Sequence, residues 1–381
     1  MNLYEFEGKE IFSKFGITIP KSVLLRRGDI VEEKYNELGI KHVVLKAQVL
    51  SGKRGKNNGI LFASNIEEVK NAVDKIFVSN IRDQYVCGIL MEEKLDIAQE
   101  HYLSITYDTN KKQPLLIYSQ SGGMEIEDVS EEKIKKVLLD VRQEKIDSDI
   151  PFAQELWNCF LKSDARVVEI NPLVITASGE KIATDAKIAL DDDAFFRHKD
   201  WDFEPRTMLG RLPTDRESMV GKIDEGENYY RGTAGKYIEM DGDIAVLFSG
   251  GGASIANMDA IIQVGLKPAN YTEYSGNPPR EKVAQLAKIV LSRPGLKGLW
   301  IAGGVANFTD IAATFQGIID ALDEIKPTYP IVVRRAGPNE EEGKRLMCEC
   351  AQRNNLNLKI FGKEVAMGAT ATALVDMINN K

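Results

Sequence analysis

A short basic segment near the N-terminus has the composition of a phosphate-binding loop. Lys46 ends an apolar stretch, and the residues after it, Ala47-Gln48-Val49-Leu50-Ser51-Gly52-Lys53-Arg54-Gly55-Lys56, combine glycine with basic side chains. Backbone N–H groups at glycines approach a phosphate closely, while lysine and arginine neutralise its charge. The segment therefore predicts a phosphate site, and the competing interpretation is a solvated basic hairpin tip.

Amide and carboxylate side chains further along the chain could hold a divalent cation beside such phosphates. Asn171 lies in the segment Glu169-Ile170-Asn171-Pro172-Leu173, which we expect at the end of a strand, and Asp185 follows on a neighbouring strand. Mg²⁺ prefers octahedral oxygen ligation and usually keeps waters and phosphates among its ligands. Asn171 and Asp185 are the predicted magnesium ligands, although an asparagine before proline is also a common turn residue.

Two further carboxylates, Glu92 and Glu100, bracket a short segment after an apolar stretch. This layout is suited to holding a ribose and the edge of an adenine. The alternative is that both are surface carboxylates.

Three turns rich in glycine and polar residues follow apolar stretches in the C-terminal part of the chain: Ser249 to Gly252, Gly303 to Thr309 and Arg334 to Asn339. Each can direct unpaired backbone N–H groups and a positive helix end at an anion. Arginine binds carboxylates bidentately, and Asn307 and Thr309 can donate to carboxylate or hydroxyl oxygens. We predict a polycarboxylate site here, against the alternative that the glycines only permit tight turns. Neither a dinucleotide-binding glycine motif nor a P-loop is present.

The first 190 residues are predicted to mix short strands and helices. A helix from Tyr4 to Phe15 ends at Gly16, and a second spans Ile66 to Val78 with Ser64 or Asn65 as its cap. Apolar stretches joined by turns indicate antiparallel hairpins and an α+β layout. The expected strands are His42–Ala47, Gly59–Ala63, Val86–Met91, Tyr102–Tyr107, Leu115–Ser119, Ala165–Ile170 and Leu173–Thr176.

The remaining residues divide into a connection and a second domain. Residues 191–241, with Asp191-Asp192-Asp193 and scattered proline and glycine, indicate a linker and connecting segments. Residues 242–381 repeat a buried strand, a glycine-rich turn and a helix, which predicts an α/β domain with a doubly wound parallel sheet. The expected strands begin at Asp243, Gly298, Pro330 and Leu358, and the expected helices span 253–264, 310–325, 340–354 and 365–378.

The overall composition is that of a globular chain with two to three domains: 381 residues, 43% hydrophobic and 28% charged. A formal net charge of −8 argues against a general nucleic-acid or anionic-membrane surface. No apolar run approaches a bilayer span and the N-terminus lacks a signal pattern. The four scattered cysteines form no C-x-x-C pair, so we expect a reduced, cytoplasmic protein.

Together these segments resemble the ATP-grasp subunit of acyl-CoA synthetases, the family of the succinyl-CoA synthetase beta subunits. The likeness covers nearly the whole chain, from Asn2-Leu3-Tyr4-Glu5 through the basic loop to Glu169-Ile170-Asn171-Pro172-Leu173-Val174. It implies an ATP-grasp domain of two subdomains at 1–190 and a flavodoxin-like CoA-ligase domain at 242–381. It also implies that Asn171 and Asp185 hold Mg²⁺ and that ATP binds Lys46, Lys53, Arg54, Gly55, Glu92, Leu95 and Glu100.

The C-terminal segments are more similar to the citrate-binding domain of ATP-citrate lyase than to the succinate-using pattern. These segments are Asn270 to Gly276, Gly303 to Thr309 and Val333 to Asn339. Citrate carries a third carboxylate and a hydroxyl that succinate lacks, and an additional arginine with an Asn/Thr pair is a reasonable counterpart. By this resemblance citrate binds Ser275, Gly276, Asn307, Thr309 and Arg335.

The family's reaction passes phosphate from ATP to a histidine and then to the acid, and CoA attacks the resulting acyl phosphate. None of His42, His101 and His198 follows a glycine-rich turn. The phosphohistidine and the CoA site are therefore expected on an alpha-like partner subunit of a hetero-oligomer, and no catalytic residue is expected in this chain. The helix end expected to face the phosphohistidine carries Ser249, Gly250 and Gly251.

The predicted function is ATP- and Mg²⁺-dependent activation of citrate with CoA to citryl-CoA, by a subunit of ATP-citrate lyase or of citryl-CoA synthetase. One alternative is a succinyl-CoA synthetase beta subunit with a changed acid pocket. Another, from a different class, is a non-catalytic citrate-sensing subunit. The preference for ATP over GTP rests on the resemblance alone.

Overall fold

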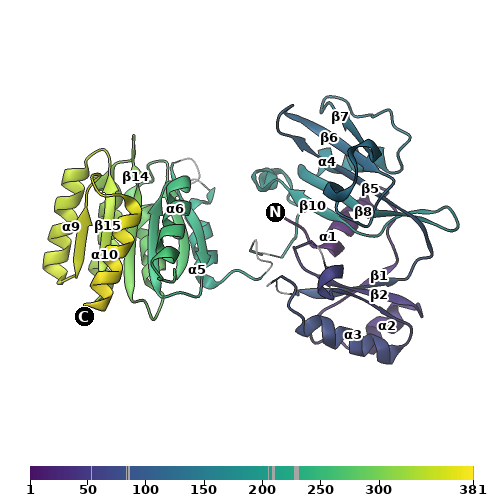
Figure 1. Ribbon diagram of the computed structural model, residues 1–381, viewed down its shortest axis with the longest axis horizontal. Coiled ribbons are helices and arrows are strands. Elements are labelled where there is room, and N and C mark those ends of the chain that lie inside the picture. Colours follow the sequence, from purple (N-terminus) through teal and green to yellow (C-terminus); the bar gives the residue numbers. More distant parts are fainter. Residues whose placement is uncertain are drawn as a thin grey trace. The chain divides into compact units, whose positions relative to one another are not determined.

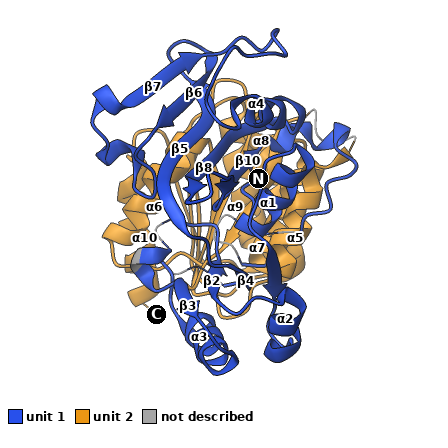
Figure 2. Ribbon diagram, turned by 90° about the vertical axis from the view of Figure 1, so that its right-hand side faces the viewer, with its two compact units in different colours: residues 1–212 blue, residues 213–381 orange. Residues whose placement is uncertain are grey.

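The computed structural model describes residues 1–52, 54–82, 84, 86–204, 206–207, 211–226 and 231–380. The chain forms two compact units, Met1–Leu212 and Pro213–Lys381, coloured blue and orange in Figure 2. Each unit buries its own hydrophobic clusters, so each is described by itself.

The first unit contains a four-stranded antiparallel sheet with two helices packed on it (Figure 1). The longer helix begins where the side chain of Asn65 accepts a hydrogen bond from the backbone N–H of Glu68, which confirms one of the two expected caps. Val69 and Leu38 from the two helices join Leu45 of the sheet in one core cluster. The strand order is β1 (Ser22–Leu25), β4 (Gly88–Glu93), β2 (Val43–Gln48) and β3 (Ile60–Ala63), with α2 (Val31–Leu38) and α3 (Ile66–Val78).

A larger antiparallel sheet of the same unit contains a β-bulge that matters for the site. Two residues of β8, Asn171 and Pro172, lie opposite the single residue Tyr102 of β5. The two strands expected on either side of this point are therefore one strand, and Asn171 lies inside that strand rather than at its end. The order is β10 (Lys187–Leu190), β8 (Ala165–Thr176), β5 (Ile97–Asp108), β6 (Gln113–Ser119) and β7 (Ile134–Leu138), with β9 (Lys181–Ala183) beside β8 and with α1 (Glu5–Lys14) and α4 (Ala153–Lys162) in the same core.

The second unit is a doubly wound sheet, as the sequence predicts. Alternate residues of its central strands enter opposite cores: Leu247 and Ile301 lie in the cluster under α7, α8 and α9, whereas Val246 and Trp300 lie in the cluster under α6 and α10. The order is β11 (Thr233–Glu239), β13 (Asn270–Ser275), β12 (Ile244–Ser249), β14 (Gly298–Val305), β15 (Ile331–Ala336) and β16 (Leu358–Phe361), with α6 (Gly251–Gln263), α7 (Arg280–Leu291), α8 (Ile311–Ile325), α9 (Glu340–Asn354) and α10 (Met367–Asn379).

The connection expected at residues 191–241 differs from the structure in its second half. Helix α5 (Asp215–Gly221) and strand β11 belong to the second unit, and β11 pairs antiparallel with β13 at the sheet edge. The sequence does not predict strand β13, because its residues are largely polar although most of them are buried. Asn270, for example, is buried and hydrogen-bonds both backbone groups of Val246. The short 3₁₀ helices are Gly55–Asn57, Ile126–Asp128, Glu131–Lys133, Asp192–Arg197 and Lys222–Asp224.

Within the described part of the chain, no helix has both the length and the apolar character that crossing a membrane requires.

The indole of Trp300 provides a test of the second core. This side chain is fully buried, and its N–H donates to Oγ1 of Thr370 on α10 at 3.0 Å. In Thr370→Val the buried donor loses its acceptor, so the free energy of unfolding of the second unit should fall by about 1–3 kcal/mol. Urea unfolding followed by tryptophan fluorescence measures it, with Thr370→Ser as the control that keeps the hydroxyl. Equal urea midpoints for Thr370→Val and Thr370→Ser would contradict a stabilising hydrogen bond between Trp300 and the Thr370 hydroxyl.

Candidate functional site

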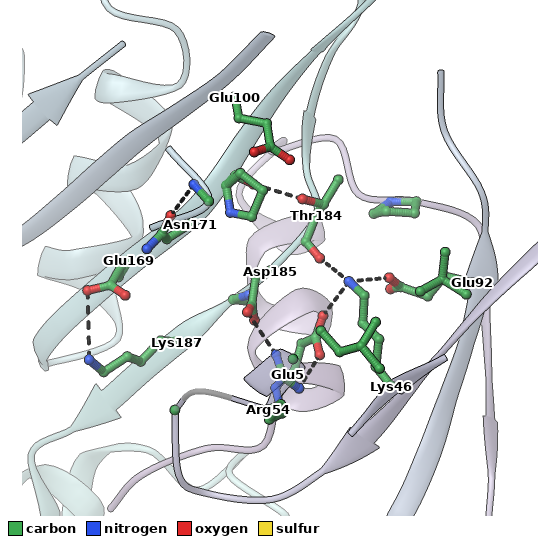
Figure 3. A pocket seen from close by; sticks show the side chains of 18 of the residues that line it. Glu5, Lys46, Arg54, Glu92, Glu100, Glu169, Asn171, Thr184, Asp185 and Lys187 are labelled. Atoms are coloured by element: carbon green, nitrogen blue, oxygen red, sulfur yellow. Dashed lines mark hydrogen bonds and ion pairs between the residues drawn. The ribbon is translucent and has the colours of Figure 1, made fainter. Parts of the chain in front are cut away.

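The first unit contains a cavity of about 680 Å³ that both of its sheets line (Figure 3). Lys46 and Glu92 reach the cavity from the four-stranded sheet, Glu100 and Asn171 from the larger sheet, and Glu5 from α1. Apolar side chains complete part of the lining: Val44, Ile60, Phe62, Leu95, Ile97 and Met124.

Two buried cations face this cavity and are held by carboxylates. The Nζ atom of Lys46 lies 3.1 Å from Oε1 of Glu5 and 2.7 Å from Oε2 of Glu92. Arg54 contacts Glu5 through Nη1 and lies 2.8 Å from Asp185 through Nη2. Burial disfavours the charged ammonium of Lys46, but Glu5 and Glu92 outweigh burial and raise its pKa. Both cations therefore stay charged.

Glu5 lies at the centre of this arrangement and is almost completely buried. Burial favours its neutral form, but Arg54, Lys46 and Lys9 outweigh burial and hold the pKa of the Glu5 carboxyl well below its usual value. Lys9 lies 2.7 Å from Oε1 of Glu5 one helical turn away and also contacts Glu92. We call the following six residues the charge cluster: Glu5, Lys9, Lys46, Arg54, Glu92 and Asp185.

Glu92, Leu95 and Glu100 all line the cavity. Glu92 is buried, with one carboxylate oxygen near Lys9 and the other near Lys46. The surface interpretation is therefore wrong for Glu92. Glu100 is exposed, and its carboxylate lies against Gly123, where an added Cβ would come within 2.3 Å of Oε2.

Asn171 and Asp185 also line this cavity. Asn171 accepts a hydrogen bond from the N–H of Gly123 at 2.9 Å and donates to the carbonyl of Met124 at 3.0 Å. Asp185 lies in the connection between β9 and β10, not on a strand, and accepts the N–H of Ala186 through Oδ1 at 2.8 Å. Among the described residues, no three or more His, Cys, Asp or Glu side chains form a metal cage. Amide and carboxylate oxygens open to one cavity fit a hard cation that takes its other ligands from phosphate and water.

The basic loop leads from β2 into a short 3₁₀ helix that begins at Gly55, and Gly52 and Gly55 both line the cavity. Lys53, which the resemblance assigns to ATP, lies outside the described residues.

In the second unit, the cap of α8 joins the strand-end turns that the sequence predicts to cooperate. Asp310 donates its backbone N–H to Oδ1 of Asn277 at 3.0 Å, and its Oδ2 accepts a hydrogen bond from Asn339 at 2.8 Å. The turns after β13, β14 and β15 therefore meet at one edge of the sheet. Thr309 is buried there and Asn307 is exposed.

The two neighbouring arginines on β15 differ in their hydrogen bonding. Arg334 donates to the carbonyls of Gly303, Val365 and Lys363, which satisfies its guanidinium inside the fold. Arg335 is only 2% exposed and donates through Nη1 to the carbonyl of Gly304, whereas its Nε and Nη2 are buried and have no hydrogen-bond partner. Two unpaired donors on a buried cation are costly unless a ligand accepts from them.

Gly303 brings the turn after β12 close to this arginine. An added Cβ at Gly303 would lie 2.4 Å from Nη1 of Arg335 and 2.8 Å from the carbonyl of Ser249. Helix α6 begins beside Ser249, and its N-cap, Gly250, has a φ of +86° and supplies no side-chain cap. Ser275 and Gly276 follow on the neighbouring strand, and the Ser275 hydroxyl lies 3.3 Å from that of Thr233.

The three histidines lie away from the cavity lining. His101 hydrogen-bonds Tyr118 and Gln99. His198 stacks on Trp201, and His42 lies beside Ser64. These contacts agree with the structural or surface roles expected for them.

Sequence reasoning did not assign a role to Glu5 or Lys9. Both lie on the buried face of α1 together with Phe12, at the spacing i, i+4, i+7. A pair of opposite charges on the same helix face as an apolar side chain is the sequence signal that would have indicated the burial of Glu5 and Lys9.

Comparisons with known proteins place these two units in familiar folds. Residues 2–151 match the ATP-grasp domain family, and residues 212–377 match the family described as ATP citrate lyase citrate-binding. The succinate–CoA ligase [ADP-forming] subunit beta of Methanocaldococcus jannaschii is 38% identical over 373 residues, covering 92% of this chain and 94% of the relative. The same subunit of Desulfurococcus amylolyticus is 35% identical over 372 residues, with 92% and 94% covered.

A solved structure of ATP citrate lyase from Methanothrix soehngenii in complex with citrate and coenzyme A has a TM-score of 0.74 to this chain. It is 24% identical and covers 98% of this chain and 99% of that chain. At this identity the match shows the fold, and it confirms the expected ATP-grasp and doubly wound architecture.

The buried carboxylate of Glu5 predicts a specific pH dependence of stability. Its folded-state pKa is lowered, so its contribution is present above the unfolded-state value of about 4.3 and is lost as pH falls below it. Glu5→Gln should lower the free energy of unfolding by about 3–5 kcal/mol near neutral pH. The difference from the native protein should shrink progressively as the pH falls from about 4 downward.

Denaturant titrations across that pH range measure the effect, and Glu10→Gln, at an exposed site on the same helix, is the matched control. A difference that does not vary with pH would show that Glu5 acts through packing instead of charge.

Proposed function

The chain belongs to the family of the succinate–CoA ligase beta subunits, and from that premise we propose that it binds ATP and citrate in an acid–CoA ligase that forms citryl-CoA. The enzyme would be an ATP-citrate lyase or a citryl-CoA synthetase. The observation that carries the acid site is the buried, partly unpaired guanidinium of Arg335, and the match of residues 212–377 to the citrate-binding family favours citrate as the acid.

ATP is the proposed ligand of the cavity in the first unit. Lys46 and Arg54 supply positive charge for the phosphates, and Gly55 allows the chain to approach them. Glu92, Leu95 and Glu100 line the same cavity and are the proposed contacts of the nucleoside. Phosphoryl transfer needs little covalent help from the protein, so positioning and charge neutralisation are sufficient contributions.

Mg²⁺ is proposed to bind Asn171 and Asp185 beside these phosphates. These two side chains would hold the ion through their oxygens, and the bound ion would supply charge neutralisation beside the phosphates. Asp185 also pairs with Arg54, so one carboxylate would position both the cation side chain and the metal.

Citrate is the proposed ligand of the second unit. Nε and Nη2 of Arg335 form the fork that a carboxylate accepts bidentately, and the match of residues 212–377 to a citrate-binding family supports this choice. Thr309 and Asn307 lie on the adjoining turn and can donate to a further carboxylate or to the hydroxyl that succinate lacks. Ser275 and Gly276 complete the proposed set.

A partner subunit is proposed to supply the phosphohistidine and the main CoA site. The N-terminus of α6, at Ser249, Gly250 and Gly251, has backbone donors without a side-chain cap, which suits an approaching phosphoryl group. The assembly would therefore be a hetero-oligomer.

Succinate is the second candidate acid, because the relatives at 35% and 38% identity are succinate–CoA ligase subunits. A non-catalytic citrate sensor is a third candidate, and Mg²⁺-dependent ATP binding by the isolated chain would count against it.

Arg335→Met tests the acid site. In the complex with the partner subunit, the KM for citrate should rise by on the order of 100-fold, because two charged hydrogen bonds are lost. ATP binding to the isolated chain should persist. A coupled assay of ADP release with citrate or succinate measures the KM, and titration calorimetry measures ATP binding. Arg345→Met, on an exposed part of α9, is the control. If the native enzyme turned over succinate and not citrate, succinate would be the substrate and the proposed choice of acid would be wrong.

Asp185→Asn tests the metal site. The Mg²⁺ concentration for half-maximal ADP release should rise at least about tenfold when a ligand carboxylate becomes an amide. The measurement is a Mg²⁺ titration at saturating ATP, with Asp74→Asn, at an exposed position on α3, as the control. An unchanged Mg²⁺ dependence would exclude Asp185 as a ligand.

A further inference from the structure

Lys9 belongs to the charge cluster but not to the cavity. It is 1% exposed, and it is absent from the described residues that line the cavity, whereas Lys46, Glu5 and Glu92 all line it. A buried lysine behind a binding site needs a reason, because isolating an ammonium from water is expensive.

The two lysines use the same three acceptors. Nζ of Lys9 and Nζ of Lys46 lie 2.7 Å and 3.1 Å from the same atom, Oε1 of Glu5. Each contacts one oxygen of Glu92, Oε1 for Lys9 and Oε2 for Lys46. Both also donate to the carbonyl of Thr184 (Figure 3 shows the contact of Lys46). An ammonium has three N–H donors, so all the donors of both lysines are engaged.

This sharing has a consequence when a phosphate enters the cavity. Lys46 can donate to a phosphate only if it gives up contacts with Glu5 and Glu92. Leaving a buried carboxylate without its cation is strongly unfavourable. Lys9 can remain with both carboxylates, because it is buried and does not line the cavity that the phosphate enters.

We propose that Lys9 is a fixed countercharge that keeps Glu5 and Glu92 paired while Lys46 transfers its hydrogen bonds to a nucleotide phosphate. The inference rests on the proposed function, since it requires a phosphate in the cavity. Lys9 is thus a positioning residue that acts through Lys46. The cluster holds three cations and three carboxylates, and without Lys9 its net negative charge would both retain Lys46 and repel the triphosphate.

The test is a charge-balance cycle on the full-length chain, with MgATP binding measured by titration calorimetry. Lys9→Met should raise the Kd at least about tenfold, as expected for an unbalanced charge in a close cluster. Glu5→Gln leaves one cation of the cluster in excess and should lower the Kd for MgATP below the native value. The double variant restores neutrality and should return to within about threefold of the native Kd. Lys14→Met, at an exposed position of α1, is the matched control and should not change the Kd.

Steady-state kinetics of the complex provide a readout that a folding defect would not reproduce. Lys9→Met should raise the KM for ATP while kcat at saturating ATP stays close to the native value. A native Kd in Lys9→Met, or a double variant at least as weak as Lys9→Met, would overturn the inference and leave the proposed ATP site intact. A native chain that binds no MgATP would overturn both.

Discussion

The buried carboxylate of Glu5 is the constraint on which the first unit depends. It joins α1 to both cations that line the cavity, since Lys46 comes from the four-stranded sheet and Arg54 from the loop after β2. Asp185, from the connection between β9 and β10, completes the link through Arg54. One set of ion pairs therefore holds together the elements that surround the cavity and sets the charge that a triphosphate would meet.

In the second unit, by contrast, a buried cation is only partly paired. Its cation, Arg335, is left with two nitrogen donors unpaired, while all three nitrogens of its neighbour Arg334 donate to carbonyls and so tie Gly303 of β14 to the segment before α10. A doubly wound sheet brings such turns to the carboxyl edge of its strands. The same edge carries the uncapped start of α6, so an acid and a phosphoryl group could approach each other there.

Many of the strands and helices could be predicted from the sequence, because their buried residues follow simple sequence patterns. The strands at Ile244–Ser249 and Ile331–Ala336 begin with continuous apolar runs, and α3 begins at a standard cap. The rest depends on pairing between distant segments. A bulge that sets Asn171 inside β8 exists only once β5 lies beside it. The burial of Glu5 with Lys9 needs Lys46 and Glu92 from two strands of the other sheet and Arg54 from the loop after β2. A buried strand with polar residues, such as β13, cannot be recognised from the sequence for the same reason.

The most direct test of the account is a crystal structure of the chain with MgADP and citrate bound. We predict a phosphate oxygen within hydrogen-bonding distance of Lys46, Lys9 still between Glu5 and Glu92, and a citrate carboxylate in the fork of Arg335. Nucleotide bound away from the charge cluster, or citrate that leaves Nε and Nη2 of Arg335 unpaired, would contradict it.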